Sequence, residues 1–168
     1  IDARISRLAL EQIKRYLVPL FAACFMSIFH GSLRSRMPEG IVRRGDILQI
    51  SPFENNLVVL ELKGKDVLEL MRNIAAVKGE AVSREVRMEI DAEGNVLQMR
   101  IGEKEIDKKR TYLIATLDYL AEGNDRMYAL KKHRRKHETG MSVRELMMES
   151  VVKNRTIDSR IEGRIVMK

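Results

Sequence analysis

The sequence predicts an α+β fold, with a mixed β-sheet, flanking helices and one β-hairpin. Two observations support this prediction. Helical and strand-like segments alternate irregularly along the chain, and one pair of strand-like segments is joined by a short turn sequence. The 168 residues suit a single compact domain over residues 1–168, because the sequence contains no internal repeat and no low-complexity linker.

The N-terminal part is predicted to be a helix followed by a buried strand. Apolar residues recur at helical spacing over residues 5–17, and Pro19 ends the helix. Residues 22–29 are short and apolar, so we expect a buried strand. The whole apolar stretch 17–29 is too short to cross a bilayer as a helix. Glycines and a proline over 31–40 predict a loop.

The central part is predicted to contain a strand, a helix and the hairpin. Residues 57–62 (LVVLEL) are rich in β-branched and apolar types, which favours a central strand. Residues 65–77 place their apolar side chains on one face, which is typical of an amphipathic helix. Residues 87–90 and 96–101 alternate as strands, and the turn composition of 91–95 joins them as a hairpin.

The C-terminal part is predicted to add two strands and one helix. Residues 112–116 form an apolar strand, and residues 164–167 form a short one. Between them, Ser142 and Glu145 have the spacing of a capping box, followed by a helical stripe of apolar residues.

The net charge of +7, from 31 Lys and Arg against 24 Asp and Glu, favours phosphates or polyanions as partners. The basic run over 131–137 (KKHRRKH) could bind nucleic acid. Because no aromatic residue interrupts this short run, a solvated loop or helix face is the simpler interpretation. His133 and His137 could share one helical face, but the surrounding cations would repel a divalent metal. We expect no metal site and no catalytic residue in this chain, and no nucleophile-elbow motif occurs.

Three loops carry candidate binding residues. In loop 51–56, Phe53 at the start of a strand could stack on a base, or it could fold back into the core. In the segment 119–125, Asp125 could accept hydrogen bonds from sugar hydroxyls, or it could be a solvated residue at a helix end. In loop 30–34, Arg34 could bind a phosphate through both ends of its guanidinium, or it could form a surface salt bridge.

Taken in order, these segments resemble the 5′-nucleotidase C-terminal domain family. The resemblance rests on residues 40–65 (GIVRRGDILQISPFENNLVVLELKGK), 81–91 (AVSREVRMEID), 112–125 and 157–166, and it is clearest over 25–168. Proteins of this family join an N-terminal metallophosphoesterase domain, which holds two metal ions, to a C-terminal domain that binds the nucleoside.

The resemblance implies a role for each candidate residue. Phe53 and Tyr119 would hold the base between them, Asn55 would contact the base edge, Asp125 would bind the ribose hydroxyls, and Arg34 would face the phosphate. It also implies a divalent metal pair in a partner metallophosphoesterase domain, in cis or in trans, and a periplasmic or cell-surface location.

This sequence departs from the family pattern at three positions. Phe29 replaces a usual asparagine, Ser32 a usual glycine, and Arg126 the glycine that normally follows the aspartate. These changes leave open a second interpretation, in which the chain keeps the fold but serves as a non-catalytic interaction module. A nucleic-acid-binding protein that uses residues 131–137 is a third, which the composition of the run disfavours.

Overall fold

The structure is a computed structural model, and it describes residues 24–29, 35, 39–157 and 162–168. The predicted helix over 5–17 and the candidate Arg34 lie outside these residues. The elements are, in order, β1 (Cys24–Phe29), α2 (Arg44–Ile50), β2 (Asn56–Lys63), α3 (Gly64–Ala76), β3 (Ala81–Val82), β4 (Val86–Ile90), β5 (Val96–Ile101), β6 (Thr111–Leu117), α4 (Asp118–Ala121), the 3-10 helix η1 (Tyr128–Lys132), β7 (Arg135–Ser142), α5 (Val143–Asn154) and β8 (Ile165–Met167). None of the described helices is long and apolar enough to cross a membrane.

The main sheet has five strands in the order β3-β1-β6-β2-β7. Strand β2 runs antiparallel to both β6 and β7, whereas β1 runs parallel to β6, so the sheet is mixed as predicted. Leu57–Leu60 in β2 are fully buried, because β2 is an inner strand that is covered on both faces. This burial explains the continuous apolar run in the sequence.

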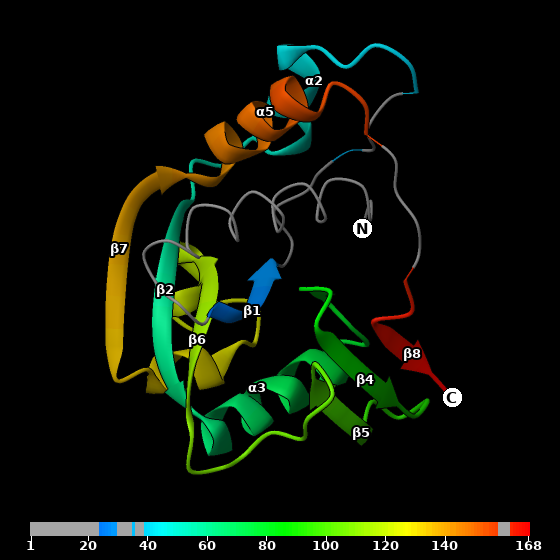
Figure 1. The fold of residues 1–168 in the computed structure, drawn as a ribbon, viewed down its shortest axis with the longest axis vertical. Coiled ribbons are helices and arrows are strands. Elements are labelled where there is room, and N and C mark those ends of the chain that lie inside the picture. The colour runs from blue at the N-terminus through cyan, green and yellow to red at the C-terminus, as the bar shows by residue number, and fades with distance from the viewer. Residues whose placement is uncertain (1–23, 30–34, 36–38, 158–161) are drawn as a thin grey trace.

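Helix α3 crosses below the main sheet and packs against η1 (Figure 1). The predicted apolar stripe is confirmed, since Val67, Leu70, Met71 and Ile74 are all fully buried in the core. The helices α2 and α5 pack together at the opposite end of the molecule.

The predicted hairpin is confirmed as β4 and β5, and it belongs to a second sheet rather than to the main one. β8 adds in parallel to β4 and gives a three-stranded sheet in the order β5-β4-β8. The Asp91 carboxylate accepts hydrogen bonds from the Asn95 side-chain amide at 2.8 Å and its backbone N–H at 2.7 Å. These bonds from Asn95 hold the pKa of Asp91 below its usual value, and they close the turn.

The short elements β3 and η1 were not predicted, and β7 and α2 differ most from the sequence predictions. Residues 135–142 form strand β7, so the interpretation of the basic run as a loop or helix face is wrong for its second half. Helix α2 was not predicted, because only Ile47 and Ile50 of its seven residues are buried. Helix α5 begins at Val143 with Ser142 at its N-cap, as predicted, although the Ser142 side chain makes no capping hydrogen bond.

Candidate functional site

Two of the three candidate loops meet at one end of the β2–β6 pair. Leu57 at the start of β2 lies opposite Leu117 at the end of β6. The loop 51–55 therefore enters the sheet where the segment 118–126 leaves it. We call this part, residues 51–56 and 117–126, the aromatic end.

The Asp118 carboxylate joins the two loops. One oxygen accepts a hydrogen bond from the backbone N–H of Asn56 at 3.1 Å, and the other accepts from the N–H of Tyr119 at 2.8 Å. A single side chain thus holds the backbone of Tyr119 and the end of the loop that carries Phe53. The sequence reasoning missed Asp118, although its position directly after an apolar strand and at the first turn of a helix could have indicated a positioning role.

Helix α5 holds the loop 51–55 from the other side. The Arg144 guanidinium donates to the carbonyl oxygen of Pro52 at 3.2 Å and pairs with Glu54 at 2.6 Å. The backbone N–H of Val143 donates to the carbonyl oxygen of Asn55 at 3.0 Å. Arg144 was not predicted either, because it lies about 90 residues further along the chain.

Both aromatic candidates are partly exposed to solvent. Phe53 is 44% exposed and Tyr119 is 45% exposed, so the alternative in which Phe53 folds into the core is wrong. By contrast, Tyr112 is 5% exposed and belongs to the core. The two aromatic side chains leave apolar area in water on adjoining loops, and exposed apolar surface that is gathered in one place marks interaction sites.

Asp125 lies next to Tyr119 and is hydrogen-bonded to it. The Tyr119 hydroxyl donates to the Asp125 carboxylate at 3.3 Å. The turn that brings them together has left-handed backbone at Gly123 (φ 79°), Asp125 (φ 51°) and Arg126 (φ 66°). Arg126 therefore occupies a conformation that favours glycine, which is the residue that the resemblance predicts there.

The remaining site candidates have different outcomes. Asn55 is partly exposed in loop 51–55, beside the point where α5 binds that loop. Arg34 lies outside the described residues, so its predicted place facing the phosphate stays a prediction. The backbone of Phe29 ends β1, whereas Ser32 also lies outside the described residues.

The two histidines of the basic run do not share a helical face. His133 follows η1 and its Nδ1 lies 3.0 Å from the carbonyl oxygen of Leu130. His137 lies in β7, with Nε2 3.3 Å from a Glu61 carboxylate oxygen. In the same strand, Lys136 donates hydrogen bonds to the carboxylates of Glu138 and Glu122, and these bonds raise the pKa of Lys136. Among the described residues, no group of three or more His, Cys, Asp or Glu side chains could hold a metal ion.

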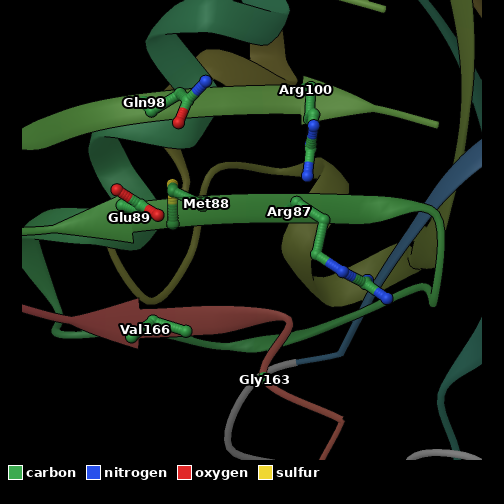
Figure 2. Close-up of a pocket in the computed structure, with 7 residues that line it drawn as sticks. All are labelled: Arg87, Met88, Glu89, Gln98, Arg100, Gly163 and Val166. Atoms are coloured by element: carbon green, nitrogen blue, oxygen red, sulfur yellow. The ribbon is translucent and has the colours of Figure 1, made fainter. Parts of the chain in front are cut away.

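A small hollow lies on the three-stranded sheet, away from the aromatic end. Figure 2 shows its lining, in which Arg87 and Glu89 of β4 lie beside Arg100 and Gln98 of β5. Its volume is about 80 Å³. Sites for small molecules have volumes of roughly 300 Å³ or more. The hollow is therefore too small to be a nucleoside site.

Comparison with known families assigns the fold. Residues 21–132 match the family model described as "5′-nucleotidase, C-terminal domain". The chain belongs to this family. The matched residues include β2, β6 and both loops of the aromatic end, so the family assignment covers the candidate site.

Relatives of this 5′-nucleotidase C-terminal domain are longer proteins. It is 27% identical to the protein UshA of Yersinia enterocolitica over 87% of this chain and 28% of that protein. It is 30% identical to a 5′-nucleotidase of Vibrio vulnificus over 81% of this chain and 25% of that protein. The chain therefore spans about a quarter of these curated relatives.

Solved structures show the same fold. A 5′-nucleotidase precursor of Thermus thermophilus superposes with a TM-score of 0.86 at 23% identity, over 99% of this chain and 35% of that one. The NAD nucleotidase of Haemophilus influenzae superposes with a TM-score of 0.77 at 19% identity, over 98% of this chain and 33% of that one.

Proposed function

We propose that the aromatic end binds the nucleoside part of a nucleotide, and that this chain is the specificity domain of a 5′-nucleotidase-type phosphohydrolase. The observation that carries the proposal is the pair of half-exposed aromatic side chains, Phe53 and Tyr119, on two loops that Asp118 ties together. Aromatic faces recognise any base by stacking, and each stacked base is worth about 1–3 kcal/mol.

The neighbouring polar groups suit the rest of a nucleoside. The Asp125 carboxylate accepts a hydrogen bond from the Tyr119 hydroxyl, which orients it. A carboxylate that is held in this way suits the two vicinal hydroxyls of a ribose. The Asn55 side-chain amide would form hydrogen bonds with a base edge. The Arg34 guanidinium would bind a phosphate. The Vibrio vulnificus relative and the Thermus thermophilus structure are 5′-nucleotidases, and the Haemophilus influenzae structure is an NAD nucleotidase, which supports this ligand class.

Hydrolysis would require a second domain. We propose that a metallophosphoesterase domain, in cis or in trans, supplies a divalent metal pair and the reacting groups. The chain matches only a quarter to a third of its longer relatives, which leaves room for such a domain in proteins of this family. The family resemblance also favours a periplasmic or cell-surface location.

Calorimetric titration with adenosine and AMP tests the nucleoside site. We expect saturable binding by the unaltered chain, and a loss of about 1–3 kcal/mol of binding free energy in each of Phe53→Ala and Tyr119→Ala. Leu97→Ala is the matched control, because Leu97 is a 56% exposed apolar side chain on β5, in the other sheet. It should bind like the unaltered chain.

The same titration decides between the proposal and the interaction module. If the folded chain binds neither ligand, or if Leu97→Ala weakens binding as much as the two aromatic substitutions do, the aromatic end is not a nucleoside site. The non-catalytic interaction module would then explain the chain better, with Arg126 at the glycine position as its motivation.

A further inference from the structure

The opposite end of the β2–β6 pair gathers three basic segments that lie far apart in the sequence. These are residues 63–65 at the junction of β2 and α3, residues 108–110 before β6, and residues 134–135 at the start of β7. Figure 1 shows these places together at the lower end of the main sheet. Backbone hydrogen bonds join them, from Gly64 N–H to the Arg110 oxygen at 2.8 Å and from Arg134 N–H to the Glu61 oxygen at 2.8 Å. We call these three segments the basic end.

Seven cationic side chains belong to the basic end. They are Lys63, Lys65, Lys108, Lys109, Arg110, Arg134 and Arg135, and all are exposed except Lys63, which is partly exposed. Arg110 lies over the ring of Tyr112, with its guanidinium carbon 5.6 Å from the ring centre. The Lys63 ammonium donates to the carbonyl oxygen of Lys109 at 3.1 Å.

Few acidic groups offset this charge. The Asp107 carboxylate lies in the same turn and accepts the backbone N–H of Lys109 at 2.8 Å. Glu61 is within 3.3 Å of the His137 ring, and Asp66 is only 8% exposed. Glu105 precedes the turn and is exposed. The basic end thus keeps a clear excess of positive charge, which attracts polyanions.

We propose that the basic end docks this domain on the surface of an anionic phospholipid bilayer. Four of the seven cations are lysines, whose flexible point charges suit a fluid array of headgroups better than a fixed, bidentate pattern of phosphates. The exposed large apolar residues of the described chain all lie elsewhere, which favours electrostatic docking without insertion.

Single-stranded nucleic acid fits the basic end less well. Binding of single strands combines a basic groove with exposed aromatic platforms, and here the ring nearest to these cations, Tyr112, is only 5% exposed. The exposed rings Phe53 and Tyr119 lie at the aromatic end, six residues or about 20 Å away along β2. A third exposed ring, Tyr128, lies at the start of η1 beside Asn73, in the second half of α3 and away from the basic end. Docking by the basic end would therefore leave the aromatic end open to solvent.

Co-sedimentation of the chain with lipid vesicles tests the docking. The probes are vesicles of phosphatidylcholine with 30% phosphatidylserine, and vesicles of phosphatidylcholine alone, each at low and high salt. We expect at least tenfold stronger partitioning to the anionic vesicles, with most of it lost at high salt. The double substitution Lys108→Glu/Lys109→Glu should lower this partitioning at least tenfold. The hydrogen bonds of Lys108 and Lys109 that order the turn use their backbone groups, which the substitution keeps.

A second double substitution, Arg44→Glu/Lys153→Glu, is the matched control. It changes the net charge by the same amount at the far end of the molecule, on α2 and α5, and its partitioning should stay within twofold of the unaltered chain. Equal losses in both variants would mean that net charge alone drives binding, and would overturn the proposal. The proposal would also fail if the chain did not bind anionic vesicles, or if it bound a 20-nucleotide DNA single strand more tightly than the vesicles at the same salt.

Discussion

At the aromatic end of the β2–β6 pair, charged side chains from distant segments hold loop 51–55, whereas at the basic end backbone carbonyl groups hold the first turn of α3. Asp118 and Arg144 supply the bonds that fix loop 51–55. At the basic end, the carbonyl oxygens of Lys108 and Arg110 accept the first N–H groups of α3. The Lys63 ammonium also donates to the carbonyl oxygen of Lys109, and most of the cationic side chains there are exposed. The comparison teaches that long-range side-chain bonds shape the loops of one end, while at the other end the backbone shapes the turn and most cationic side chains face solvent.

The largest effect is expected from Gly64→Ala, which disrupts the close backbone contact between α3 and the 107–110 turn at the basic end. A Cβ atom at Gly64 would lie 1.9 Å from the carbonyl oxygen of Asp107, which is backbone and must move. We expect a loss of about 2–3 kcal/mol in the free energy of unfolding, measured by urea denaturation. Displacement of the 107–110 turn should also weaken vesicle binding.

Gly45→Ala is the control for this substitution. Gly45 lies in α2, where an added Cβ meets nothing within 4 Å, so alanine should be neutral or slightly stabilising. If Gly64→Ala unfolds at the same urea concentration as Gly45→Ala, the contact between α3 and the 107–110 turn is not what orders the basic end.

A smaller effect on stability, but a larger one on binding, is expected from Asp118→Ala. The substitution removes the acceptor of the Asn56 and Tyr119 N–H groups, and loss of such a bond costs about 1 kcal/mol. Because both loops lose their shared anchor, we expect the adenosine affinity to fall several-fold while the sheet stays folded.

Asp118→Asn is the intermediate variant, because its amide oxygen can still accept one of the two hydrogen bonds. Its adenosine affinity should lie between those of the unaltered chain and Asp118→Ala. An alanine variant that binds adenosine with unchanged affinity would show that the strand pairing alone positions the loops, and the contrast between the two ends would disappear.

The sequence predicted the elements whose pattern is local. The buried run of β2, the apolar stripe of α3 and the turn composition around Asp91 each lie within a short window, and all three predictions are confirmed. Strand β7 was missed because an edge strand buries little, and its sequence RKHETGMS contains one large apolar residue, Met141.

Long-range contacts explain the rest of what the sequence did not predict. The positions of Phe53 and Tyr119 at strand ends followed from the sequence, but the bonds from Asp118 and Arg144 that connect them did not. The basic end likewise depends on the pairing of β2 with β6 and β7, which brings 63–65, 108–110 and 134–135 together. In the sequence, only residues 134–135 belong to a recognisable basic run.

The smallest effect is expected from Arg126→Gly. This substitution tests whether the Arg126 side chain stabilises the aromatic end enough to offset the strain in its own backbone. Arg126 has φ 66°, a left-handed conformation that costs a non-glycine residue about 1 kcal/mol. Glycine should therefore raise the free energy of unfolding by about 0.5–1 kcal/mol, less the entropy that glycine gains when unfolded. Arg155→Gly provides the control, because Arg155 has φ 58° at the end of α5, on another element. Both variants should gain similar stability in urea denaturation, and neither should bind adenosine more weakly. A loss of stability in Arg126→Gly alone would mean that the Arg126 side chain contributes more than its backbone costs, so that this departure from the family's glycine is itself part of how the aromatic end is built.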